Sequence, residues 1–177
     1  MSGHSKWAQT KHKKAAVDEK KGKAFSKLGK LITLATKDKG PNPEMNPQLR
    51  AAIEKAQAAN MPKDTIDRAV GKGAGSDAPE LASVMYEAYG PGGIAMIIVG
   101  VTDNNNRTVA EVRKILADFG AKMTPGGASW LFEKSADGWR ARTPTSLANP
   151  GDAERLRKLT AALLEHDDIQ EVYSNAA

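Results

Sequence analysis

The sequence contains no cysteine, and only three of its residues are histidines. The absence of cysteine excludes a disulfide framework, a thiolate nucleophile and a cysteine-ligated metal, and it fits a reducing compartment. The histidines His4, His12 and His166 are too scattered for a zinc motif, and none has an evident partner for a catalytic triad. The sequence therefore predicts a protein that is not an enzyme and that needs no metal or other cofactor.

Long hydrophobic runs are also absent. The longest apolar run, residues 94–99, is far too short to cross a bilayer, and no apolar segment follows the first residues as it does in a secretion signal. We therefore expect no membrane partner and a cytoplasmic location. The 177 residues, 40% hydrophobic and 27% charged, have the composition of a folded chain of one or two domains.

Arginine is absent before Arg50, whereas lysine is concentrated at the start of the chain. The first 39 residues contain eleven lysines and three acidic residues and carry a net charge of +8, while the remaining residues carry −3. Such a concentration of ammonium groups attracts a polyanion, whose condensed counterions are released on binding. Nucleic acid is the expected partner. The alternative is a solvated lysine-rich terminus that only keeps the protein in solution.

Lysine without arginine favours contact with the phosphate backbone over the reading of bases. A lysine side chain is a compact charge on a flexible stem, whereas bidentate recognition of guanine is mostly achieved by arginine. Trp7 and His12 lie among the lysines, where they would stack on an unpaired base and favour RNA over duplex DNA; packing of Trp7 onto the helices is the alternative. The candidate phosphate contacts are Lys6, Lys11, Lys13, Lys14, Lys23, Lys27 and Lys30.

The first part of the sequence predicts an all-helical domain. Apolar residues recur at three- and four-residue steps between residues 23 and 39, which indicates an amphipathic basic helix. Asn46 and Pro47 supply the cap and first residue of a second helix, and Pro62 opens a third helix that Gly71 is expected to end. Residues 71–79 have the small, polar composition of a linker, so we place the domains at residues 1–75 and 76–177.

The second part of the sequence predicts an α+β domain. Residues 84–89 and 94–101 have the pattern of strands joined by a glycine-rich turn, and further strands are expected at residues 128–133 and 169–173. Helices are expected at residues 108–119, where Thr108 and Glu111 match a capping box, and at residues 152–166. The order ββαβαβ is typical of a sandwich with helices on one face of a mainly antiparallel sheet.

The polar loop at residues 103–107 has two interpretations. It lies between a strand and a helix N-terminus, where backbone N–H groups and Arg107 would bind an anion or an RNA phosphate. Capping and turn formation explain the same residues. One enzymatic alternative uses this loop: a small phosphatase of acylphosphatase-like architecture, with Arg107 and Asn105 as anion clamps, an idea that rests on fold analogy alone.

The two helices that meet at residues 60–62 have the order of a helix-turn-helix motif. The second of them is short and carries Asp64 and Asp67, which would repel phosphates. Plain helix packing is therefore the favoured interpretation.

Several short motifs, in the same order along the chain, resemble those of the YebC family. The opening one is Gly3-His4-Ser5-Lys6-Trp7, followed by Lys11-His12-Lys13-Lys14 and by Gly22-Lys23 with Phe25-Ser26-Lys27-Leu28. Later blocks are Asn60-Met61-Pro62-Lys63-Asp64, Tyr89-Gly90-Pro91-Gly92-Gly93, Thr102-Asp103-Asn104 with Asn106-Arg107-Thr108, and Ser129-Trp130-Leu131-Phe132-Glu133. The C-terminal stretch, residues 164–175, also resembles the end of that family, so the resemblance covers the whole chain.

The resemblance has one large departure. Family members usually carry a third, ferredoxin-like domain between the motif at residues 129–133 and the closing helix, where this chain has only a short loop at residues 134–151. The resemblance therefore implies a member that lacks most of that domain. The implied fold is of the α+β class, with an N-terminal basic three-helix domain followed by a ferredoxin-like antiparallel α/β sandwich.

The resemblance also implies a function without catalysis. Family members are described as DNA-binding transcriptional regulators and as ribosome-associated translation factors that ease the synthesis of difficult stretches such as consecutive prolines. Both roles need a surface that binds a polyanion, so the implied partner is duplex DNA or, on the ribosome, ribosomal RNA. A third class, an assembly protein with an acidic partner, would keep its partner at salt concentrations that remove nucleic acid.

Overall fold

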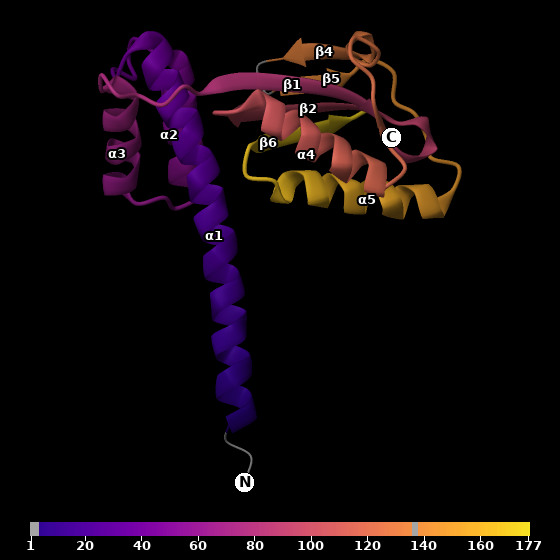
Figure 1. Cartoon of the computed structure of the whole chain (residues 1–177), viewed down its shortest axis with the longest axis horizontal. Coiled ribbons are helices and arrows are strands. Elements are labelled where there is room, and N and C mark those ends of the chain that lie inside the picture. The colour runs from indigo at the N-terminus through magenta and orange to yellow at the C-terminus, as the bar shows by residue number, and fades with distance from the viewer. Residues whose placement is uncertain (1–3, 136–137) are drawn as a thin grey trace. The chain divides into compact units, whose positions relative to one another are not determined.

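The computed structural model describes residues 4–135 and 138–177, with side chains from residue 17 onward (Figure 1). The chain divides into two compact units, Met1–Pro79 and Glu80–Ala177. The hydrophobic cluster of the first unit shares no residue with the clusters of the second. Each unit therefore has a core of its own.

The first unit begins with one long helix, α1 (His4–Lys39), about 54 Å in length at 1.5 Å per residue. Its packed side begins at Phe25, and Ile32 and Ala35 are buried further along. Residues 17–22 are exposed, and Figure 1 shows this part of α1 extending past α2 (Pro47–Ala58) and α3 (Lys63–Ala74). The later part of α1 is thus a core element, while residues 17–22 form an arm.

Asn46 connects the end of α1 to the start of α2. Its Oδ1 accepts the backbone N–H of Leu49 at 3.0 Å, which confirms the cap predicted from the sequence. The Nδ2 of the same buried side chain donates to the carbonyl oxygens of Ala35 at 2.7 Å and Gly40 at 2.9 Å. One side chain therefore satisfies backbone groups at two helix ends and fixes the turn between them.

The third helix differs from its prediction at both ends. Pro62 is its N-cap and not its first helical residue, and the helix continues through Gly71 to Ala74. Beyond Gly71, α3 lies very close to α1, because a Cβ added to Gly73 would lie only 2.4 Å from the carbonyl oxygen of Thr33. The hydroxyl of Thr33 also donates to the carbonyl of Ala69 at 3.1 Å. Packing against α1 therefore extends the helix past the glycine that was expected to end it.

The second unit is built on a four-stranded antiparallel sheet in the order β3-β1-β2-β6. Strands β1 (Ala82–Tyr89) and β2 (Ala95–Thr102) form a hairpin around a short 3-10 turn, Pro91–Gly93, while β3 (Lys122–Met123) and β6 (Ile169–Ser174) flank it. Helices α4 (Asn105–Asp118) and α5 (Pro150–Glu165) lie on one face of this sheet, as Figure 1 shows. The predicted α+β class, with helices on one face of an antiparallel sheet, is confirmed.

The main core of this unit lies between the sheet and its two helices. Alternate residues of a strand point to the same face, and Met96 and Ile98 of β2 are fully buried on the helical side. Burial of one such side chain stabilises the fold by about 1.5–3 kcal/mol. The helices contribute the facing residues Val112, Leu116, Leu156, Leu159 and Leu163.

The opposite face of the sheet is covered by a second, two-stranded sheet. Strand β4 (Phe132–Ser135) pairs with β5 (Gly138–Ala141) and follows a 3-10 turn, Ser129–Leu131. Phe132 packs with Ala95 and Ile97 of β2. The strand predicted at residues 128–133 is therefore wrong for residues 128–131, and the third strand of the main sheet is Lys122–Met123. A hydrophobic pattern shows that a segment is half-buried, but not which sheet it joins.

Candidate nucleic-acid interface

The described lysines of α1 do not belong to the hydrophobic cluster of the first unit. Positions seven apart share a helix face, and this spacing relates Lys20 to Lys27 and Lys23 to Lys30 and Lys37. The side chains of Lys23, Lys27 and Lys30 are half-buried, and each has a partner within the chain. Lys20 is exposed on the arm. These ammonium groups form a basic stripe along the helix.

Most of the remaining candidate contacts lie on the first turns of α1. The backbone of residues 4–16 is helical, but the side chains there lie outside the described residues. This applies to Lys6, Trp7, Lys11, His12, Lys13 and Lys14. Their contact with nucleic acid, and the stacking or packing of Trp7, stay predictions.

Arg107, the one candidate outside α1, is held by two carboxylates. Its Nη2 lies 2.8 Å from Oδ1 of Asp103 and 2.9 Å from Oδ2 of Asp168. The hydrogen bond to Asp168, then the one to Asp103, raises the pKa of the Arg107 guanidinium above its usual range. The side chain is 44% exposed, but its charge is already balanced within the unit.

Asp168 lies at the centre of this network although it is far away in the sequence. Its side chain is 2% exposed, and Oδ2 accepts the hydroxyls of Thr102 at 3.0 Å and Thr108 at 2.6 Å as well as Arg107. Thr108 lies inside α4, and its hydroxyl donates to the buried acid. The predicted capping box is wrong, because the cap is Asn104, whose Oδ1 accepts the N–H of Arg107 at 3.1 Å.

A bulge in β6 brings Asp168 to this position. The register of β2 against β6 shifts between Val99 and Gly100, and the N–H of Val101 donates to the carbonyl of Asp168 at 2.8 Å. A Cβ on Gly100 would lie 2.6 Å from that same carbonyl oxygen. Only glycine allows the two segments to approach so closely.

His166 extends the network toward α4. Its Nδ1 accepts the backbone N–H of Asp168 at 3.1 Å, so the proton of the neutral ring lies on Nε2, which is 2.8 Å from Oε2 of Glu111. Tyr86 donates to Oδ1 of Asn105 at 2.7 Å, and its burial, with the charge of Asp168, raises its pKa. The two residues of the phosphatase hypothesis, Asn105 and Arg107, are thus hydrogen-bonded to other side chains of the second unit. These bonds fix the loop at residues 103–107.

The sequence patterns did not predict that Asp168, Thr102 and His166 meet. A signal existed, since the motifs at residues 102–108 and 164–170 both carry polar residues at the ends of hydrophobic segments. Only the sheet topology shows that these two motifs lie side by side.

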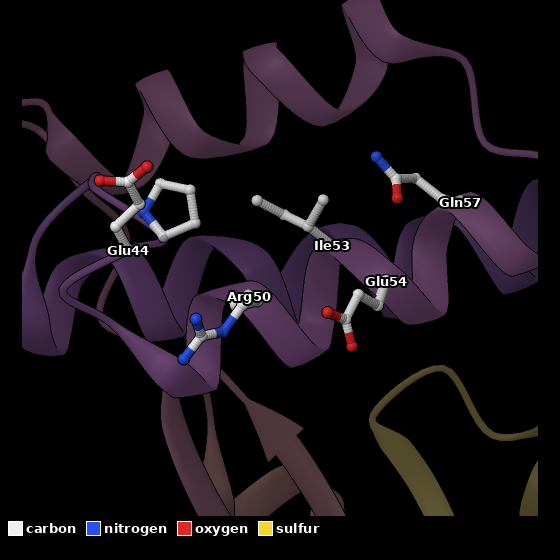
Figure 2. Close-up of a pocket in the computed structure, with 6 residues that line it drawn as sticks. Glu44, Arg50, Ile53, Glu54 and Gln57 are labelled. Atoms are coloured by element: carbon white, nitrogen blue, oxygen red, sulfur yellow. The ribbon is translucent and has the colours of Figure 1, made fainter.

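The first unit has a small groove along α2, of about 260 Å³. Figure 2 shows Ile53 in it, with Glu44 toward one end and Gln57 toward the other. Arg50 and Glu54 complete the lining together with Pro43. The groove is smaller than most ligand sites and carries charges of both signs, so it does not extend the basic stripe of α1.

Across the described part of the chain, no group of three or more histidine and acidic side chains is placed to hold a metal ion. Within the same residues, no helix combines the length and the hydrophobicity that crossing a membrane requires.

Comparison with known proteins decides the family. Residues 5–76 match the model of the TACO1/YebC protein N-terminal domain, and residues 81–137 match that of the TACO1/YebC second and third domain. The chain belongs to the TACO1/YebC family. The resemblance found in the sequence motifs is therefore confirmed.

Individual TACO1/YebC relatives show the same likeness. A probable transcriptional regulatory protein of Dictyoglomus turgidum is 54% identical over 137 residues, which cover 76% of this chain and 55% of that protein. One from Thermosipho africanus is 36% identical over 235 residues, covering 99% and 93%. The crystal structure of a conserved hypothetical protein from Aquifex aeolicus, Aq1575, superposes with a TM-score of 0.82 at 31% identity, covering 91% of this chain and 92% of that one.

The chain spans about half the length of several TACO1/YebC relatives that it matches, 54–55% of each. The match to the second and third domain ends at residue 137, just before β5. The alignment with the Thermosipho africanus protein, at 235 residues, is longer than the 177 residues of this chain. The shorter length fits a loss of most of the third domain, and the placement of that loss at residues 134–151 stays a prediction.

Proposed function

We propose that this chain is a non-enzymatic nucleic-acid-binding regulator of gene expression, a DNA-binding transcriptional regulator of the YebC type. The observation that carries the proposal is the basic stripe of α1, on a helix that extends past the rest of its unit. Lysines seven residues apart stand about 10 Å apart along the axis, a row of positive charge that a phosphate backbone can follow. The relatives named as probable transcriptional regulatory proteins support a regulatory role.

The proposed contacts read shape and charge more than base sequence. The stripe contains lysine and no arginine, and the corner between α2 and α3 does not supply a reading helix. Arg68 of α3 is turned back onto its own helix, where it donates to the carbonyl of Asp64 at 3.2 Å and to the hydroxyl of Thr65 at 3.1 Å. We therefore assign phosphate contact to the lysines, with Trp7 and His12 beside them, and to Arg107 the positioning of its loop.

The lack of a base reader also favours a second candidate, a ribosome-associated translation factor that binds ribosomal RNA. Lysine contacts to a backbone serve either polyanion, and ribosomal RNA presents a fixed shape that needs no sequence reading. The two roles differ in where the protein is found in the cell, which gives a direct test.

The test is crosslinking in cells followed by sequencing of both the DNA and the RNA recovered with the protein. Discrete promoter peaks without ribosomal RNA support the transcriptional role, whereas enrichment of one ribosomal RNA site supports the translational role. A variant with Lys20, Lys27 and Lys30 changed to glutamine serves as control, because it removes charge from the stripe. Equal recovery of nucleic acid by the variant and the parent would contradict the proposal.

A further inference from the structure

Trp130 is the exposed residue of a motif that the proposed function does not use. The ring is 68% exposed, while the neighbouring Phe132 is 2% exposed in the cluster beneath β4. Among the described residues between 122 and 142, Trp130 is the one large hydrophobic side chain that is exposed. A large aromatic ring that faces solvent in an otherwise packed motif needs an explanation.

The ring is held in a fixed position. Its Nε1 donates to the carbonyl of Gly127 at 3.0 Å, and the hydroxyl of Tyr89 donates to the same carbonyl at 2.9 Å. Below it, the carboxylate of Glu87 accepts the N–H groups of Ala128 at 2.7 Å and Ser129 at 2.8 Å. Three side chains thus order the turn during folding, so a ligand would bind without the entropic cost of ordering it.

Basic side chains lie beside this turn. Arg142 is anchored to it, because its backbone N–H donates to the carbonyl of Leu131 at 2.8 Å and its Nε donates to that of Phe132 at 2.9 Å. Arg140 is exposed on β5, two residues earlier. Neither guanidinium forms an ion pair with a carboxylate in the described part of the chain. Arg140 lies opposite Glu133 in the β4–β5 pair, but no ion pair joins these two described residues, so both guanidinium groups can contact an anion.

We propose that Trp130 is a stacking platform for an unpaired base of single-stranded nucleic acid, with Arg140 and Arg142 facing the adjoining phosphates. This inference rests on the proposed function and adds a second contact site, in the second unit. Base stacking on an aromatic ring with nearby basic groups is the general mode of binding to single strands. A protein partner fits less well, because one isolated ring does not form the apolar centre of a protein interface.

The test compares fluorescence anisotropy titrations of the whole chain with labelled single-stranded U12 RNA and with a blunt 12-base-pair duplex. Loss of one stacking contact weakens affinity by about five- to 150-fold. Trp130→Ala should therefore weaken binding to U12 by at least about fivefold and change duplex binding by less than about twofold, whereas Trp130→Phe should stay near the parent. Arg140→Gln should weaken U12 binding, while Arg113→Gln, an exposed arginine on α4, serves as the matched control.

A second readout locates the contact. The chain labelled with 5-fluorotryptophan gives a fluorine resonance for each of Trp7, Trp130 and Trp139, assigned by single phenylalanine substitutions. Added U12 should shift the Trp130 resonance. An unmoved resonance, an equal loss of both nucleic acids in Trp130→Ala, or a protein partner that depends on Trp130 without any effect on U12 would each overturn the inference. If variants of the α1 lysines no longer bind U12 or the duplex while Trp130→Ala binds both like the parent, the inference alone fails. If the parent binds neither U12 nor the duplex, both proposals fail.

Discussion

Asp168 is a buried acid on which at least three donors converge. The two threonine hydroxyls and the guanidinium of Arg107 compensate the loss of water around its carboxylate. Removing the acid would leave the hydroxyls of Thr102 and Thr108 buried without this acceptor, and would leave Arg107 with Asp103 and, at 4.0 Å, Glu111. The residue therefore joins the β6 end of the sheet to the start of α4.

Changing Asp168 to alanine should lower the free energy of unfolding by about 2–4 kcal/mol. The expected loss is moderate because Arg107 is 44% exposed, so water screens its charge. Urea unfolding of the whole chain measures the effect, with Asp118→Asn as control at an exposed position of α4, where a change within about 0.5 kcal/mol is expected. Equal stabilities of Asp168→Ala and the control would show that the network contributes nothing.

Glu87, on the other face of the sheet from the α4 and α5 helices, is a second carboxylate that stabilises the fold, and its contribution depends on pH. Burial alone would raise the pKa of its carboxyl, but hydrogen bonds from the N–H groups of Ala128 and Ser129 outweigh burial and lower the pKa below 4.5. Because the pKa is lower in the folded state, the stabilisation is fully present above pH 4.5 and is lost as the pH falls through the folded-state value. Below that value the protonated acid no longer accepts these bonds as a charged group.

Glu87→Gln should therefore unfold about 1–2 kcal/mol more easily than the parent at pH 7, since its bonds to the turn are no longer charge-assisted. The difference between the two proteins should shrink as the pH is lowered past 4.5. Denaturant unfolding at a series of pH values measures this, with Glu133→Gln, at an exposed position of β4, as control. A difference that does not vary with pH would exclude the charged hydrogen bonds as its cause.

At the scale of elements, α1 joins two tasks in one helix. Its later turns supply Ile32 and Ala35 to the core, while the lysines occupy other faces. Substitutions in the arm, residues 17–22, should therefore change binding without loss of stability. This separation makes the helix suited to a charge-removal experiment.

Changing Lys11, Lys13 and Lys14 together to alanine should weaken binding to every nucleic acid sequence alike. If each lysine neutralises one phosphate, the slope of log affinity against log salt should become shallower by about three units. The matched control changes three exposed lysines elsewhere, Lys63, Lys72 and Lys114, which should leave the slope within about one unit of the parent. An unchanged slope in the variant of Lys11, Lys13 and Lys14 would remove these lysines from the interface.

How far the sequence predicts the elements depends on the range of the signals involved. The cap at Asn46 was predicted correctly, because residues a few positions apart determine it. The end of α3 was predicted wrongly, because the contact of Gly73 with Thr33 depends on residues forty positions apart. Thr108 was mistaken for a cap for the same reason: the distant Asp168 is its partner.

The candidate site follows the same rule. Composition alone located the lysines of the first 39 residues, since a charge excess is visible without a fold. The sequence did not show that Arg107 is neutralised by Asp103 and Asp168, nor that Trp130 is exposed while Phe132 is buried. Exposure and pairing of single side chains depend on the topology, which the pattern of neighbouring residues does not determine.

At the scale of the whole molecule, the net charge and the hydrophobic cores both divide between the same two units. The first unit, Met1–Pro79, carries a net charge of +8, and the second, Glu80–Ala177, carries −3. Each unit buries its own hydrophobic clusters. The side chain of Lys37 donates from Nζ to the carbonyl of Pro79, and both residues belong to the first unit. The positive field of the protein therefore belongs to one unit.

A fragment of residues 1–79 should fold by itself and bind duplex DNA with the salt slope of the whole chain, because it keeps both the lysines and the core that supports α1. A fragment of residues 80–177 should bind the same duplex at least about tenfold more weakly, since it has lost the positive field. Circular dichroism with thermal unfolding tests folding, and anisotropy between 50 and 200 mM salt, the range over which phosphate contacts lose most of their affinity, tests binding. A folded first fragment whose slope falls well below that of the whole chain would mean that the second unit contributes phosphate contacts to a duplex, and the division of labour argued from charge would be wrong.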